Sequence, residues 1–230
     1  MIKIFTIILI MFSICITPFR AYALSEEEIK LPLPRLEGKI SVEEALARRR
    51  SRRAFKDYPL TLEQVSQLLW SAQGITSKGG IGRTSKRTAP SAGAVYPLDI
   101  YLVVGKDKVE DLKVGVYHYN PLQHSLTIIL EEDRRREISQ ACLDKNQIEN
   151  APVCLIITAE FSRLTDRLGE DDINFVYMEA GHVAQNIYLQ VESLGLGTVS
   201  MGGIREKDIS QALNLPEQHI PLYVMPVGHY

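Results

Sequence analysis

Five arginines and one serine form the segment Arg48-Arg49-Arg50-Ser51-Arg52-Arg53. The planar guanidinium group of arginine matches the oxygens of a phosphate, and a serine hydroxyl adds another donor, so the segment could hold a phosphate-bearing ligand. Arginines at the end of a helix also stabilise its negative C-terminal dipole, and the residues alone leave both interpretations open. Because the cluster is short and the formal net charge of the chain is -2, we expect no nucleic-acid surface.

Two further segments are rich in small residues. One is the run Pro90-Ser91-Ala92-Gly93, which continues to Pro97, and the other is Met201-Gly202-Gly203. Small side chains allow backbone amides to approach a planar ligand closely. Each segment taken by itself is equally well explained as a turn of the chain.

Metal ligands are not apparent in the sequence. The chain has no C-x-x-C motif and no cluster of histidines, so we expect no metal site. Cys154 lies in the apolar run from Val153 to Ile157 and is expected to behave as a small core residue. An oxidising compartment would permit a disulfide between Cys142 and Cys154, but the pattern does not indicate one.

Taken together, the three segments resemble motifs of the FMN-dependent nitroreductase superfamily. Arg49, Arg50, Ser51 and Arg53 match an R-R-S-x-R-x-F motif that in this family holds the flavin phosphate and pyrimidine edge. The stretch from Pro90 to Tyr101 is similar to the family's P-S loop, in the S-A-G form typical of the SagB/ThcOx branch of dehydrogenases. Gly115-Val116-Tyr117-His118-Tyr119 also resembles a segment of this branch. Gly195-Leu196-Gly197 together with Gly202-Gly203 resembles the glycine turns of the family.

This resemblance covers about Ser41 to Tyr230 and implies the site. It implies a homodimer with FMN in a cleft at the subunit interface. The implied cofactor-binding residues are Arg49, Arg50, Ser51, Arg53, Pro90, Ser91, Ala92, Gly93, Gly202 and Gly203. The last loop would bring backbone amides near the flavin, with the Gly203 N–H bonded to N5, and the P-S-A-G loop would come from the other subunit.

The resemblance also implies the chemistry, an FMN-dependent oxidoreductase that passes a hydride between substrate and flavin N5 without a catalytic side chain. We expect a small-molecule or peptide-derived substrate that is oxidised, as in the SagB/ThcOx branch. The alternatives are an NAD(P)H-dependent nitro or quinone reductase and a flavin-binding protein without catalysis.

Two departures from the family pattern lead to further expectations. Ala94, Tyr96 and Leu98 stand where many relatives have polar and aromatic residues, which suggests a different substrate pocket, and we expect Ala94, Val95 and Leu98 to form an apolar, open wall. Many relatives supply a basic phosphate ligand from a C-terminal extension, which this sequence lacks after Tyr230. Phosphate binding is therefore expected to depend on the arginine segment.

The N-terminal residues 1–23 are expected to form a secretory signal peptide. Lys3 precedes an apolar run from Ile4 to Thr17, and Ala21-Tyr22-Ala23 is an A-x-A cleavage site. The run is shorter than the ~20 residues that span a bilayer, so an uncleaved membrane anchor is the less favoured alternative. We expect an exported protein, with residues 24–40 as a leader and 41–230 as one FMN-binding domain.

The order of the expected helices and strands predicts an α+β fold, with a central mixed or antiparallel sheet flanked by helices. Capping boxes at Ser41 with Glu44 and at Thr61 with Gln64 predict two helix starts. Ser77 to Ser91 is expected to be loop. Expected helices are 131–142, 172–194 and 206–213, and expected strands are 99–104, 116–119, 125–130, 152–159, 198–201 and 222–227.

Overall fold

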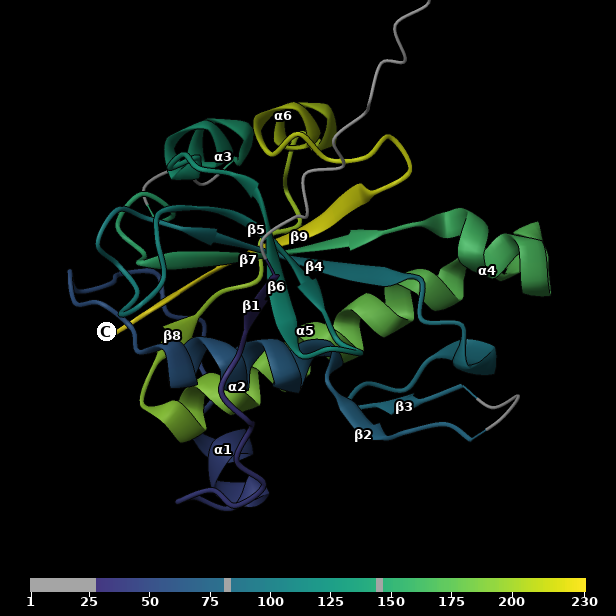
Figure 1. The fold of residues 1–230 in the computed structure, drawn as a ribbon, viewed down its shortest axis with the longest axis horizontal. Helices are drawn as coiled ribbons and strands as arrows, with labels where there is room; N and C mark the ends of the chain where they lie inside the picture. The colour runs from purple at the N-terminus through teal and green to yellow at the C-terminus, as the bar shows by residue number, and fades with distance from the viewer. Residues whose placement is uncertain (1–27, 81–83, 144–146) are drawn as a thin grey trace, which may run out of the picture.

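A seven-stranded sheet forms the centre of the computed structural model, which describes residues 28–80, 84–143 and 147–230. Neighbouring strands run antiparallel in the order β1-β6-β5-β4-β7-β9-β8 (Figure 1). The bounds are β1 Glu28–Lys30, β4 Leu98–Val104, β5 Gly115–Asn120, β6 Ser125–Leu130, β7 Val153–Ala159, β8 Gly197–Thr198 and β9 Ile220–Gly228. This confirms the predicted α+β class and shows an antiparallel sheet. The expected signal peptide lies outside the described residues.

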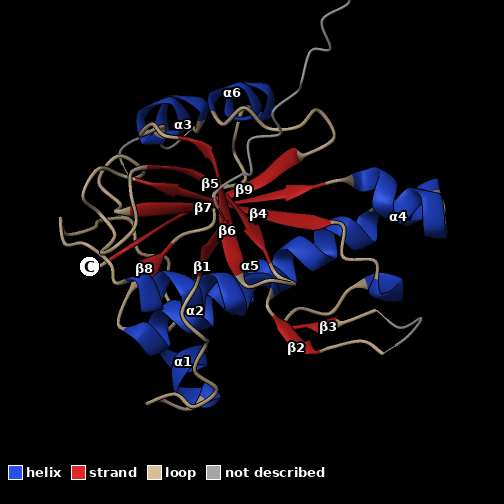
Figure 2. Cartoon of the chain, viewed as in Figure 1, coloured by secondary structure: helices blue, strands red, loops and turns tan. Residues whose placement is uncertain are grey.

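Helices cover both faces of this sheet (Figure 2). On one side lie α2 (Leu62–Gln73) and the long α5 (Asn174–Leu194), with α1 (Val42–Arg48) packed on α5. On the other side lie α3 (Arg135–Ala141) and α6 (Glu206–Ala212), and α4 (Phe161–Leu168) follows β7 at the end of the sheet. The central strands are therefore buried on both faces.

The strand β4 shows how the sequence produces these two layers. Successive side chains of a strand point to opposite faces. Leu98, Ile100 and Leu102 belong to the core shared with α2 and α5, whereas Tyr101 and Val103 belong to the core shared with α3 and α6. Strand β7 is buried at all seven positions, which explains its continuous apolar sequence.

The predicted helix signals are mostly realised. Thr61 and Gln64 form a complete capping box at the start of α2. At α1, the Ser41 hydroxyl accepts from the Glu44 N–H, but the Glu44 carboxylate pairs with Arg48 and completes no box. Gly195 ends α5 in the left-handed conformation that favours glycine.

Several element predictions were wrong. Residues 28–30, expected to lie in a leader before the fold, form the edge strand β1 and pair with β6. The expected loop after Ser77 contains β3 (Lys86–Arg87), which pairs with β2 (Ile75–Ser77). Helix α3 begins at Arg135 instead of 131, and α4 had not been predicted. Strand 198–201 is reduced to β8 and one isolated bridge at Met201.

The structure also shows the state of the two described cysteines and whether any described helix could span a membrane. Cys142 and Cys154 are both buried free thiols, and Cys154 is a core residue as expected. Within residues 28–80, 84–143 and 147–230, no helix has the length and apolar character needed to cross a membrane.

Candidate functional site

The arginine segment and the glycine turn meet at Tyr188 of α5. Ser51 forms a parallel bridge with Thr198, and the Arg52 N–H donates to the Thr198 carbonyl at 2.8 Å. The Tyr188 hydroxyl lies 3.0 Å from Ser51 Oγ and accepts from the Ser200 N–H at 2.9 Å. One helix residue therefore brings together two segments that are about 150 residues apart in the chain (Ser51 to Ser200).

This meeting point has a positive electrostatic bias. The Arg49 guanidinium lies 5.2 Å from the centre of the Tyr188 ring. Burial by itself would raise the pKa of Tyr188, but hydrogen bonds with Ser51 and Ser200 and the Arg49 charge together lower it. Hydrogen-bonding groups and the Arg49 guanidinium are thus gathered at one point, which is the kind of environment that binds a phosphate.

The arginines of the segment separate into two sets. Arg50 donates to the Ala47 and Arg49 carbonyls at 3.0 and 2.8 Å, which is the helix-end role, and Arg52 stacks on the Tyr230 ring at 4.2 Å. Arg49 and Ser51 face Tyr188 instead. Because side chains alternate along extended chain, Arg53, which is exposed, is expected on the same side. Arg50 therefore caps the end of α1 in this structure, and its cofactor role stays a prediction.

The glycine turn presents open backbone next to this point. Gly202 and Gly203 are exposed, and in the part of the chain that the structure describes neither N–H donates a hydrogen bond. A Cβ at Gly203 would lie 2.9 Å from a methyl carbon of Leu143, and one at Gly202 would lie 3.2 Å from the Tyr223 ring. The missing Cβ atoms thus allow Leu143 and Tyr223 to pack closely against the turn, and the two N–H groups stay available to a ligand.

The P-S-A-G loop lies elsewhere along α5. It forms the short 3-10 turn Ala92–Ala94, and Gly93, Ala94 and Tyr96 all have positive φ, at 58°, 53° and 56°. The Tyr96 N–H donates to Ser91 Oγ at 2.9 Å, and hydrogen bonding from Ser91 lowers the pKa of Glu179, although burial raises it more.

One part of the expected substrate wall is wrong. Leu98 is 1% exposed and belongs to the core of the sheet, as does Tyr96 at 6%. Alternation along β4 turns Leu98 inward toward α2 and α5. Of the three expected wall residues, Ala94 and Val95 are partly exposed, so these two stay in the predicted wall and Leu98 does not.

A single chain does not bring all three segments to one point. Glu179, which contacts the second loop, and Tyr188, which joins the other two segments, are nine residues apart on α5. At 1.5 Å per residue this separates them by about 14 Å. A cavity of about 640 Å³ lies between residues 35–42, α2 and α5, and no predicted cofactor residue lines it.

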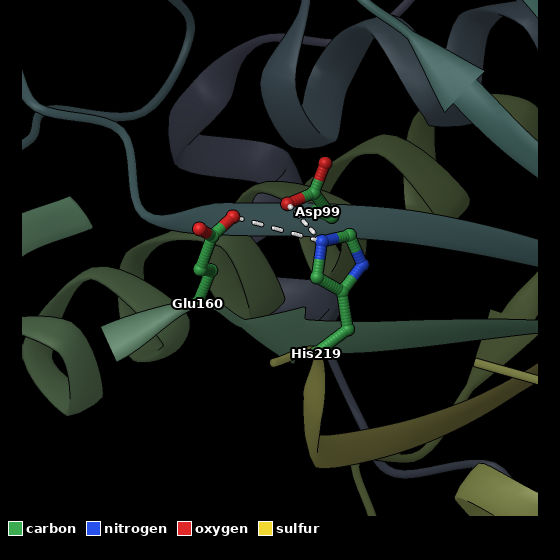
Figure 3. Close-up of side chains that lie close together, drawn as sticks. All are labelled: Asp99, Glu160 and His219. Atoms are coloured by element: carbon green, nitrogen blue, oxygen red, sulfur yellow. Dashed lines mark ion pairs between the residues drawn. The ribbon is translucent and has the colours of Figure 1, made fainter. Parts of the chain in front are cut away.

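A separate polar cluster fixes the chain just after the second loop. Figure 3 shows His219 beside the carboxylates of Asp99 and Glu160, with Nε2 3.7 Å from an oxygen of each. Arg163 already bonds both carboxylates, at 2.7 and 2.6 Å. The Tyr101 hydroxyl bonds the other ring nitrogen of His219 at 2.7 Å. We therefore assign this cluster as an ion-pair network that ties α4 to the sheet.

Sequence reasoning missed Tyr188, Ser200 and Glu179. Tyr188 and Glu179 lie on the buried face of α5, where the helical pattern had been explained by apolar packing alone. The available signal was a carboxylate and a phenol at positions that the 3.6-residue period turns inward, since buried charged residues normally have partners.

Comparisons with known proteins identify the family and the fold of the chain. The model of the family described as "Nitroreductase family" matches residues 46–229. MJ1384 of Methanocaldococcus jannaschii, named as a nitroreductase, is 43% identical over 88% of this chain and 97% of its own length. A solved structure from Ralstonia eutropha, also described as a nitroreductase, has a TM-score of 0.73 and 30% identity, covering 90% of each chain.

More distant relatives differ in their named activities. The microcin B17-processing protein McbC of Escherichia coli is 24% identical over 74% of this chain, which spans 62% of McbC. The FMN reductase [NAD(P)H] of Bacillus subtilis is 28% identical over 53% of this chain and 54% of its own length. From the family match and these relatives, the chain belongs to the nitroreductase family and is an FMN-dependent oxidoreductase.

Proposed function

We propose that FMN binds where the arginine segment meets the glycine turn. Arg49, Arg50, Ser51 and Arg53 would hold the phosphate and the pyrimidine edge, with Ser51 oriented by Tyr188. The free N–H groups of Gly202 and Gly203 would face the ring system. These residues fit FMN, because guanidinium groups and the Ser51 hydroxyl can bind its phosphate and the free Gly202 and Gly203 N–H groups can donate to its ring.

We propose further that a second copy of the chain completes this site with its P-S-A-G loop. The separation of the loop from Tyr188 in one chain supports this arrangement. Exposed apolar side chains lie on α5 within four residues of Glu179, where Tyr177 and Met178 are 54% and 57% exposed and Phe175 is 39% exposed. A surface of this kind is typical of an interface between subunits.

For the reaction, we propose oxidation of a peptide-derived or heterocyclic substrate, as in the SagB/ThcOx branch. Bound FMN would accept the hydride at N5 of its ring. The chain would bind and orient the substrate, and Ala94 and Val95 would exclude water from it. The likeness to McbC, whose name gives it a processing role, together with the S-A-G loop, is the observation that carries this proposal.

Reduction by NAD(P)H is the second candidate. It is favoured by the likeness to the Bacillus subtilis FMN reductase and by the higher identity to MJ1384. A flavin-binding protein without turnover is a third candidate, and it differs from both in showing no turnover with any donor.

Rapid mixing separates the first two candidates. Oxidised holoprotein is mixed with NADH or NADPH in a stopped-flow instrument, and the visible flavin absorbance is followed. The proposal predicts slow or no bleaching with either nucleotide, because Ala94 and Val95 give a nicotinamide few hydrogen-bond partners. Rapid bleaching followed by turnover with a quinone or nitroarene would establish the reductase.

We also propose that the protein is exported through the signal peptide at residues 1–23. Reduced nicotinamide cofactors are scarce outside the cytoplasm, so export agrees with a substrate that supplies its own electrons. N-terminal sequencing of the secreted protein should begin near Leu24, and an intact N-terminus on an exported chain would indicate an anchor.

A further inference from the structure

A network of hydrogen bonds and one cation–π contact joins α2 and α5 to the second loop through Arg87. Gln73 of α2 donates to Glu179 of α5 at 3.1 Å and accepts from Arg87 Nη1 at 3.1 Å. The Arg87 guanidinium lies 4.5 Å from the centre of the Tyr96 ring, and the backbone N–H of Arg87 donates to the Tyr96 hydroxyl. The Tyr96 backbone N–H donates to Ser91 Oγ within the loop at 2.9 Å.

This network joins the loop to α2 through Gln73 and to α5 through Glu179. Gln73 and Glu179 are 1% and 2% exposed, so they are fixed inside the α2 and α5 packing. Burial lowers the pKa of Arg87 and raises the pKa of Glu179, which shows that both groups give up solvation to be here. Gln73 offsets part of this cost at Glu179 Oε1, whereas Oε2 has no hydrogen-bond partner among the described residues.

The loop needs this support because its backbone is strained. Ala94 and Tyr96 adopt the left-handed region with φ of 53° and 56°, which non-glycine residues adopt rarely. The Tyr96 side chain is held from two directions, by the guanidinium over its ring and by the bond at its hydroxyl. These contacts fix the residue whose conformation is least favourable.

We propose that Gln73 and Arg87 are positioning residues that hold residues 91–97 in the conformation that contacts the flavin of the partner subunit. Neither residue touches the cofactor in this proposal, and both act through Tyr96 and Ser91. The flavin contact in this inference rests on the proposed function. The network that holds the loop is observed in the structure and does not depend on that proposal.

The chain offers a matched control for the test. Gln67 lies on the same helix, is 7% exposed, and donates to Gln190 of α5 at 3.2 Å. It therefore makes the same kind of buried bond between α2 and α5 as Gln73, but it contacts Arg35 and not the loop. Gln73→Met and Arg87→Met are compared with Gln67→Met, and Arg87→Lys tests rescue by a conservative change.

Hydrogen exchange of the full-length holoprotein is the first readout. Amides of residues 92–96 should exchange about tenfold faster or more in Gln73→Met and Arg87→Met, because the loop opens more easily. They should change less than about twofold in Gln67→Met, with Arg87→Lys in between. If Arg87→Met fails to fold, Gln73→Met carries the comparison. Unchanged exchange in Gln73→Met would overturn the proposal.

Visible circular dichroism of bound FMN is the second readout, and it needs no substrate. The flavin bands should change in Gln73→Met and Arg87→Met and remain as in the wild type in Gln67→Met. Faster loop exchange with unchanged flavin bands would show that the loop does not face the flavin and would overturn the positioning role. If the wild-type protein binds no FMN, the proposed function is contradicted. The hydrogen-exchange rates still show in that case whether the network fixes the loop.

Discussion

The Tyr188 hydroxyl joins two segments through one oxygen atom. In Tyr188→Phe, Ser51 and the Ser200 N–H lose this partner while the ring below Arg49 remains. A lost hydrogen bond of this kind costs about 1 kcal/mol, so FMN affinity should fall about fivefold. Titration of apoprotein with FMN, followed by flavin fluorescence, measures the change. The exposed Tyr58→Phe is the control, and equal affinity in both variants would remove Tyr188 from the site.

Arg53 tests the phosphate role of the arginine segment. Replacing it by alanine should weaken FMN binding by about 1.5–3 kcal/mol, the range for a hydrogen bond to a charged group. Lys56→Ala removes a nearby exposed cation and should leave the affinity unchanged. The same fluorescence titration compares them. If Arg53→Ala binds FMN as the wild type does, the segment has only its helix-end role.

At the residue scale, the sequence predicted the segments but not the direction of each side chain. The types and order of residues identified the arginine segment, the second loop and the glycine turn. The pattern alone did not reveal that Arg50 would cap α1 while Arg49 faced Tyr188. That division depends on where α1 ends and on the bridge between Ser51 and Thr198, which is a contact between distant parts of the chain.

Helix α5 connects the two parts of the proposed site, and its Glu179 makes the connection sensitive to pH. Burial raises the pKa of Glu179 in the folded protein above its unfolded value. The folded state therefore binds this proton more tightly, and the associated stability is present at low pH and lost as pH rises through the raised pKa.

Glu179→Gln should remove this dependence while keeping a hydrogen-bonding side chain. The free energy of unfolding of the variant relative to wild type should increase from about pH 4.5 upward and level off above the folded pKa. Urea denaturation at a series of pH values measures the difference. A difference that stays constant across this range, or that falls with rising pH, would contradict the assigned shift.

At the element scale, local signals predicted most elements, and the failures have physical causes. The capping box at Thr61 and the apolar period of α5 identified those helices. Helix α4 has no side-chain cap at its start, although Phe161, Leu164 and Leu168 have helical spacing. Strand β1 has only three residues, too few to show alternation, and it exists because β6 provides an edge to pair with.

For the whole molecule, we expect a homodimer in solution. Separation of the subunits would expose Phe175, Tyr177 and Met178 of α5 to solvent and open the proposed flavin site. Light scattering of the holoprotein at micromolar concentration should give twice the mass of the chain. Met178→Glu, which places a charge in this surface, should shift the protein toward monomer and release flavin. A wild-type monomer that retains FMN would contradict the shared site.

The absorbance spectrum of the purified protein tests the central claim most directly. We predict a yellow protein with visible flavin bands equivalent to about one FMN per chain. Because the proposed contacts are all noncovalent, heat denaturation should release the flavin into the supernatant as free FMN. A colourless protein that also fails to bind added FMN would contradict the account.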